Sequence, residues 1–372
     1  MFDSYLDKVL AIVLVTFTFT AFIIPMVIKI AYHIGAIDVP KDNRRVHTKP
    51  IPRLGGLGIF FGFLFGYMFF GIQSVQMNSI LIGSFIIIVL GICDDIKPIT
   101  AKQKLLGQIA AALVIMFYGN ILLTEITALG YTLQFGVFTY PITLFFIVAC
   151  TNIINLIDGM DGLSGGISSI FFLTIGIIAF FQGRIDSLEI TITFLMLGAT
   201  LGFLLYNFNP AKIFAGDGAC FLGFMIAIIS LLGFKGTLLT SFIVPLLVLA
   251  IPILDTFFAI IRRLLKGKPI FEADKEHLHH QFLKMKFSQK TTVLIIYSMN
   301  ILFSLTSIFY ALGDPKKATI IYIVLLAIVI WFVLHTSIIS EKVSDKVKSF
   351  ENKKIKQIKM KVKNTPKEDE KV

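Results

Sequence analysis

Long apolar runs recur along almost the whole chain and are separated by short polar connections. Each run covers about 16 to 24 residues, and a helix of that length crosses or nearly crosses the ~30 Å hydrocarbon layer of a bilayer. Backbone polar groups in lipid must be satisfied within their own segment, so these runs predict membrane-spanning helices. The pattern predicts eleven of them, at 9–31, 54–72, 78–93, 105–123, 140–157, 163–182, 188–206, 218–233, 238–261, 291–312 and 318–339.

The composition supports this interpretation. Hydrophobic residues make up 56% of the 372 positions and charged residues only 15%, which is outside the range of soluble domains. We therefore predict an all-α, polytopic transmembrane helical bundle in which residues 1–340 form one membrane domain. Residues 341–372 form a basic tail, for which an amphipathic helix on anionic lipid and a solvated segment are both open.

Lysine and arginine are distributed unevenly between the two sets of connections. Twenty-eight of the 34 fall in one set and five in the other. Because cytoplasmic connections carry the excess of basic residues, we expect the N-terminus outside the cell membrane and the C-terminus in the cytoplasm. An odd number of spans requires the same arrangement. The net charge of +11 therefore reflects membrane orientation, and we expect no nucleic-acid partner.

The chemically unusual residues lie together on the predicted cytoplasmic side. They are Asp94 and Asp95 in "GICDDIKP", Asn155, Asp158 and Asp161 in "NIINLIDGMDGLSGG", Asn207 and Asp217 in "YNFNPAKIFAGDGACFLG", His277, His279 and His280 in "DKEHLHHQF", and His47 and Arg53 in "RRVHTKPIPRLGG". A carboxylate at the end of a span favours a polar cavity over lipid. The sequence therefore predicts one inward-facing site built from several connections.

The residue types indicate what this site binds. Aspartates supply the hard oxygen ligands that Mg²⁺ or Mn²⁺ prefers, and Asn155 adds an amide oxygen without further negative charge. Lys104 and the histidines stand around this acidic centre. Carboxylates that hold a cation, surrounded by basic groups that hold anions, are the arrangement that phosphoryl transfer needs.

Other interpretations are open for each motif taken alone. Asp94 and Asp95 suit a solvated helix boundary, and the "DGMDG" segment suits a simple turn. Asp255 lies within the ninth apolar run and is interpreted as a packed polar contact. An ion-coupled transporter is the competing class. It would place polar residues near the membrane midplane and show paired repeats, and neither pattern is present in the sequence.

Over roughly residues 35–290, the motifs "GICDDI", "NIINLIDGMDGLSGG", "NFNPAKIFAGDGACFLG" and "EHLHHQF" resemble the polyprenyl-phosphate N-acetylhexosamine-1-phosphate transferases of glycosyltransferase family 4. The resemblance implies a UDP-sugar donor, a polyprenyl phosphate acceptor in the membrane lipid, a Mg²⁺ cofactor and release of UMP. The HxHH form is similar to the branch that transfers N-acetylglucosamine 1-phosphate to undecaprenyl phosphate, which starts teichoic acid, O-antigen or similar glycans. The phospho-N-acetylmuramoyl-pentapeptide transferases are the alternative. A homodimer is a further expectation.

The resemblance also implies residue roles. Asp217 and Asn155 would bind Mg²⁺, and Asp94 and Asp95 would be the catalytic pair, acting on the acceptor phosphate. The remaining roles concern substrate: Lys104, His277, His279 and His280 would hold phosphates, Asp158, Asp161 and Asn207 would shape the nucleotide pocket, and His47 and Arg53 would lie near the acceptor. One departure is Gln281, where the family commonly has arginine.

Overall fold

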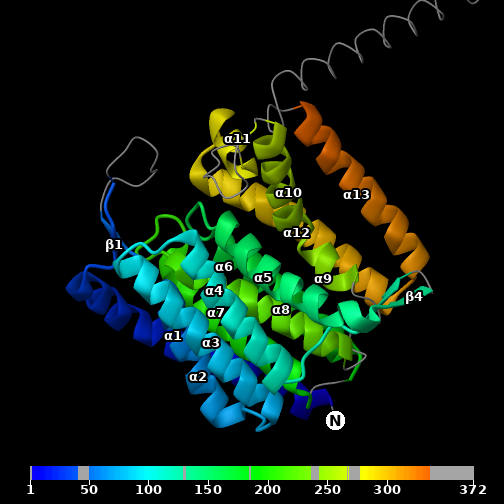
Figure 1. Cartoon of the computed structure of the whole chain (residues 1–372), viewed down its shortest axis with the longest axis horizontal. Coiled ribbons are helices and arrows are strands. Elements are labelled where there is room, and N and C mark those ends of the chain that lie inside the picture. Colours follow the sequence, from blue (N-terminus) through cyan, green and yellow to red (C-terminus); the bar gives the residue numbers. More distant parts are fainter. Residues whose placement is uncertain are drawn as a thin grey trace, which may run out of the picture.

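The computed structural model describes residues 2–40, 50–128, 131–183, 186–235, 243–265, 267 and 277–335. His47 and the tail at 341–372 lie outside these ranges. Within them the chain is almost entirely helical, which confirms the predicted all-α class. Most of the long helices pack side by side along a similar direction, and α10 crosses it at an angle (Figure 1).

Ten of the eleven predicted apolar runs each overlap one long helix of the structure. The long helices are α1 (Phe2–Ile34), α2 (Gly55–Phe70), α3 (Val75–Ile96), α4 (Ala101–Leu113), α5 (Thr139–Ile157), α6 (Leu163–Phe181), α7 (Leu188–Asn207), α8 (Ala219–Lys235), α10 (Ala250–Leu265), α12 (Gln289–Leu312) and α13 (Pro315–His335). The ninth run is divided between α9 (Ile243–Val248) and α10. Within the described ranges, eight helical segments are long and apolar enough to cross a membrane, which makes this a multi-pass membrane protein.

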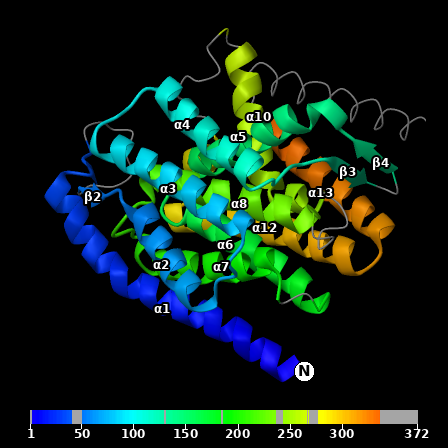
Figure 2. The same ribbon diagram turned by 60° about the horizontal axis from the view of Figure 1, so that its bottom comes forward.

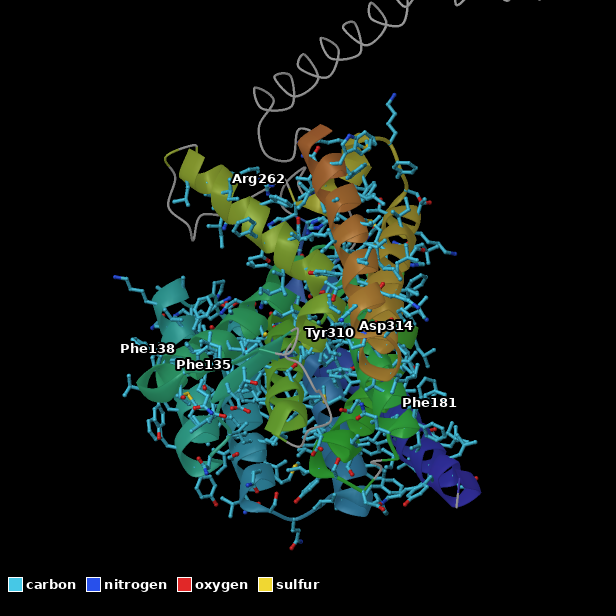
Figure 3. The ribbon with its side chains drawn as sticks, turned by 90° about the vertical axis from the view of Figure 1, so that its right-hand side faces the viewer. Phe135, Phe138, Phe181, Arg262, Tyr310 and Asp314 are labelled. Carbon is cyan, nitrogen blue, oxygen red and sulfur yellow. The ribbon has the colours of Figure 1, made fainter. Side chains whose placement is uncertain are left out.

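Short elements join the helices at their ends. β1 (Ile37–Asp38) pairs antiparallel with β2 (Ile51–Pro52), and β3 (Glu125–Ala128) pairs antiparallel with β4 (Tyr131–Gln134). The two pairs lie at opposite ends of the helices (Figures 1 and 2). Figure 3 looks toward the end that carries the β3–β4 pair, where Phe135, Phe138 and Asp314 are labelled, and Arg262 lies apart from them on α10.

The centre of the bundle is α8. Ninety-four per cent of the apolar window that begins at Gly216 is buried, against 28% for α1 and 17% for α13. A helix that is apolar on all sides is stable only when neighbours surround it, and α8 packs against α3, α5, α6 and α7. The short 3₁₀ turn η3 (Gly216–Gly218) that leads into α8 is therefore held in the interior, and it carries Asp217.

Glycine permits the close approach of α2 to this turn. A Cβ atom on Gly56 would lie 2.2 Å from the Cα atom of Gly218, and a Cβ on Gly218 would lie 2.3 Å from the Cα of Gly56. The backbone N–H groups of Gly55 and Gly56 donate to the carbonyls of Phe214 and Ala215 at 2.8 and 3.1 Å. These contacts fix η3 against the start of α2.

Candidate active site

Three buried aspartates meet at the end of α3. Asp94 and Asp95 lie in its last turn, and Asp217 faces them from η3. Each is 7% exposed, and one carboxylate oxygen from each lies within 4.8 Å of the others. The three aspartates meet because the end of α3 packs against η3 and the start of α8. Three hard oxygen ligands at this spacing fit a divalent cation such as Mg²⁺ or Mn²⁺.

The backbone around Asp217 depends on Gly216. The Asp217 N–H donates to both carboxylate oxygens of Asp95, at 3.2 and 3.3 Å. Gly216 has a φ of +64°, and a Cβ there would lie 2.0 Å from the Arg53 carbonyl oxygen and 2.3 Å from Asp95 Oδ2. Only glycine combines this left-handed conformation with such close neighbours.

Two basic side chains face the aspartates. Lys104 Nζ lies 2.8 Å from Asp94 Oδ2 and 2.5 Å from Asp217 Oδ2. Arg53 Nε lies 3.2 Å from Asp95 Oδ1. A capping box of Thr100 and Gln103 starts α4 and so sets Lys104 in its first turn. Three carboxylates face two cationic groups, so the cluster is suited to accept further positive charge.

Asp217 and Arg53 line a cavity of about 280 Å³, whereas Asp94, Asp95 and Lys104 are not in its wall. Its lining residues are Asp38, Arg53, Asn155, Asp158, Gly159, Met160, Asp161, Phe214, Gly216, Asp217, His280, Leu283 and Gln289. The predicted residues Arg53, Asn155, Asp158, Asp161, Asp217 and His280 are among them. Four aspartates against one arginine and one histidine make this wall predominantly acidic, so it suits a hydrogen-bonding anion that binds together with a divalent cation.

The turn between α5 and α6 supplies Asp158 and Asp161. Ser164 Oγ donates to Asp158 Oδ1 at 2.5 Å, and burial raises the pKa of Asp158 to about 6. Asp161 Oδ2 accepts hydrogen bonds from Asn209 Nδ2 at 2.9 Å and from the Ala211 N–H at 3.0 Å. Asp161 therefore ties this turn to the segment that follows α7.

Asn207 makes a second connection between the same two segments. Its Oδ1 accepts from the Gly162 N–H at 3.0 Å, and its Nδ2 donates to the Ile213 carbonyl at 2.9 Å. Asn207 is 1% exposed and is not in the cavity wall. Its side chain holds the walls of the cavity together, so its predicted role in shaping the pocket would be indirect.

The three histidines are placed differently by the short helix α11 (Leu278–Lys284). His280 lines the cavity, whereas His277 and His279 are 5% and 2% exposed and lie outside its wall. A Cβ on Gly159 would lie 2.6 Å from His279 Nε2, so this imidazole packs beneath the Asp158–Asp161 turn. Gln281 is also buried, 3% exposed, and is not a cavity residue.

Burial of His279 predicts a pH-dependent stability. Burial, with the nearby imidazoles of His280 and His277, lowers the pKa of His279 from 6.5 to about 3. As the pH falls the unfolded chain takes up this proton first, so stability is complete above about pH 6.5 and is lost toward pH 3 by about 1.4 kcal/mol per unit. We expect the Tm in detergent to fall more steeply between about pH 7.5 and 5 for wild type than for His279→Gln. Parallel curves would contradict this assignment.

Comparison of the sequence with known proteins identifies the family. A model of glycosyl transferase family 4 matches residues 77–234. A probable undecaprenyl-phosphate N-acetylglucosaminyl 1-phosphate transferase of Bacillus subtilis is 40% identical over 361 residues, which cover 94% of this chain and 97% of the relative. The chain belongs to glycosyltransferase family 4. Membership makes it a phosphoglycosyltransferase, as the resemblance of its motifs predicted, and favours that class over a transporter.

More distant family 4 relatives cover most of the chain as well. A decaprenyl-phosphate N-acetylglucosaminephosphotransferase of Mycobacterium tuberculosis is 33% identical over 300 residues, 72% of this chain and 74% of the relative. An undecaprenyl-phosphate alpha-N-acetylglucosaminyl 1-phosphate transferase of Escherichia coli O157:H7 is 32% identical over 290 residues, 75% of this chain and 78% of the relative. The named acceptors of these relatives are polyprenyl phosphates.

Some residues of this family 4 site are not apparent from the sequence. Asp38 and Gln289 line the cavity, although neither belongs to the motifs that predicted the site. Cys220 lies behind Asn155, whose Nδ2 is 2.9 Å from Cys220 Sγ. That contact leaves the Asn155 amide oxygen for the cavity. The position of Cys220 one turn after Asp217 in α8 was the available signal, but a buried thiol alone is usually a packing residue.

Proposed function

We propose that this enzyme transfers N-acetylglucosamine 1-phosphate from UDP-GlcNAc to undecaprenyl phosphate, releases UMP and requires Mg²⁺, with Mn²⁺ as an alternative. The product would be the first membrane-bound intermediate of a cell-surface glycan such as teichoic acid or O-antigen. The observation that carries this proposal is the cluster of Asp94, Asp95 and Asp217, paired with Lys104 beside a charged cavity. The names of the relatives support the same transferred group and the same acceptor.

The proposal includes a membrane orientation. We infer eleven spans with the N-terminus outside and the site at the cytoplasmic face. The distribution of lysine and arginine supports this, because the connections that carry the carboxylates and histidines belong to the basic set. A site at that face would meet a cytosolic nucleotide sugar and the head group of a lipid phosphate together.

Different residues would bind the cation, the phosphates and the nucleotide, because the donor and the acceptor are both anions. Asp217 and the Asn155 amide oxygen would hold Mg²⁺, which neutralises phosphate charge when bound. Asp94 and Asp95 lie close enough to Asp217 to share this cation and would act on the acceptor phosphate. Lys104, Arg53 and His280 would contact phosphate oxygens and reduce the repulsion between donor and acceptor. An oxygen of the acceptor phosphate would form a bond to the phosphorus that carries the sugar. The bond between that phosphorus and the oxygen that leaves with UMP would break at the same time. Asp158 and Asp161, in the cavity wall, would orient the nucleotide.

The donor is the first property to test. Purified protein in detergent is given undecaprenyl phosphate, Mg²⁺ and either radiolabelled UDP-GlcNAc or radiolabelled UDP-MurNAc-pentapeptide, and label is followed into the lipid phase. We expect lipid label from UDP-GlcNAc and none from the muramyl donor. Turnover with the muramyl donor alone would assign the enzyme to peptidoglycan synthesis instead. No lipid label from either donor would contradict the proposed reaction.

A further inference from the structure

Asp255 on α10 uses both oxygens of its carboxylate at the start of α11. Its Oδ2 lies 2.9 Å from His277 Nδ1, and its Oδ1 accepts from the Leu278 N–H at 2.7 Å. Asp255 is 6% exposed and His277 is 5% exposed. A carboxylate accepts hydrogen bonds, so this contact places a proton on His277 Nδ1. One side chain of α10 thus fixes both the first imidazole and the first N–H of α11.

The segment that Asp255 fixes carries part of the cavity wall. His280 and Leu283 of α11 line the cavity. His279 lies in the chain between His277 and these two cavity residues. Its ring stacks on the ring of His277, with 5.7 Å between the ring centroids and an interplanar angle of 1°. His279 also packs beneath Gly159, between Asp158 and Asp161 in the chain. The position of α11 therefore determines where His280 stands and supports the adjoining aspartate turn.

We propose that Asp255 and His277 are positioning residues of the transferase site. His277 serves as a hydrogen-bond donor to Asp255, and the pair holds α11 so that His280 reaches the donor phosphates. His280 is the substrate-contacting histidine of the three. This inference rests on the proposed function. It differs from the expectation that all three histidines hold phosphate. If His277 acts only through its hydrogen bond to Asp255, another side chain with a donor at the position of Nδ1 can replace its imidazole.

Asparagine at position 277 separates the two roles. Its amide nitrogen occupies nearly the place of imidazole Nδ1, so His277→Asn keeps the bond to Asp255 and removes the ring. We expect kcat/KM for UDP-GlcNAc to stay within about threefold of wild type in His277→Asn and to fall by about tenfold or more in His277→Ala. The loss in His277→Ala should lie mainly in the donor KM, because His280 is displaced while the carboxylate cluster is intact.

Asp255→Leu gives the complementary test. Leucine is close to aspartate in size and has no acceptor, so both the Leu278 N–H and His277 Nδ1 lose their partner. We expect a fall in kcat/KM of about tenfold, and no further fall when His277→Ala is added, since both changes break one connection. The matched control is Glu189→Gln, which neutralises another buried acid, 7% exposed, in the first turn of α7. We expect it to match wild type.

The outcomes are distinct. Equal losses in His277→Asn and His277→Ala would mean that the imidazole itself is required, and would overturn the inference. Wild-type kinetics in Asp255→Leu would also overturn it. So would a double variant, Asp255→Leu with His277→Ala, whose loss of kcat/KM equals the product of the two single losses. A fall in Tm with unchanged donor KM would reduce the pair to a structural role and would also overturn it. An inactive wild type would overturn the proposed function, and this result is read before any variant is compared.

Discussion

Asp217→Asn is expected to lower sugar-phosphate transfer by about 10³-fold while the protein keeps its fold. Asparagine preserves the size of the side chain, and Lys104 keeps its ion pair with Asp94. The loss would therefore come from the missing negative charge, which weakens a cation ligand and removes the charged partner that Lys104 Nζ contacts at 2.5 Å. The initial rate of lipid labelling, measured beside the Tm in detergent, gives both quantities.

The matched control is Asp186→Asn. Asp186 is exposed, forms an ion pair with Lys8 and lies beyond the far end of α6 from the site. We expect its rate and Tm to equal those of wild type, since exposed pairs contribute little to stability. Transfer within about threefold of wild type in Asp217→Asn would contradict the role given to the carboxylate cluster.

Gly216→Ala is expected to reduce transfer by about 100-fold and to lower the Tm. Two effects combine at this position. The left-handed φ of +64° disfavours any side chain by about 1 kcal/mol, and the new Cβ would meet the Arg53 carbonyl and an Asp95 oxygen. The backbone must shift, and Asp217 shifts with it away from Asp94 and Asp95.

Gly183→Ala separates these two effects. Gly183 has a similar φ of +69°, but a Cβ there meets nothing within 4 Å among the described residues. We expect this variant to show a small loss of Tm and wild-type transfer. Equal loss of transfer in both variants would mean that backbone strain in general, and not crowding beside Asp95, lowers the activity. That result would contradict the geometry assigned to the site.

The helices were predictable because a run of apolar residues long enough to cross a bilayer has few alternatives to a helix. The ninth run was predicted as one span, although the sequence carried a signal for its division into α9 and α10. Pro252 has no N–H to donate to Val248, the last residue of α9, so a continuous helix is disfavoured there. The short pair β1–β2 and helix α11 left no periodic pattern. The start of α11 is fixed by Asp255, which accepts a hydrogen bond from the Leu278 N–H and lies 23 positions earlier in the chain.

The sequence indicated which polar residues would lie near one another, but it did not indicate which of them would be in contact. Asp94, Asp95 and Asp217 follow or precede apolar runs, so membrane topology alone places them at one face. Which histidine lines the cavity depends on how α10 and α11 pack, and adjacent letters in "HLHH" give no sign that His279 is buried and His280 is not. Asp255 was expected to be a packed polar contact, and the structure adds its partner, His277.

The most direct test of the central claim is the metal dependence of transfer by the wild-type protein. Radiolabelled UDP-GlcNAc and undecaprenyl phosphate are incubated with protein in detergent over a series of Mg²⁺ concentrations, and labelled lipid and released UMP are measured in the same samples. We predict equal amounts of the two products, both rising with Mg²⁺ and both abolished by EDTA. Lipid product that forms undiminished in EDTA would contradict a cation-dependent centre at Asp94, Asp95 and Asp217.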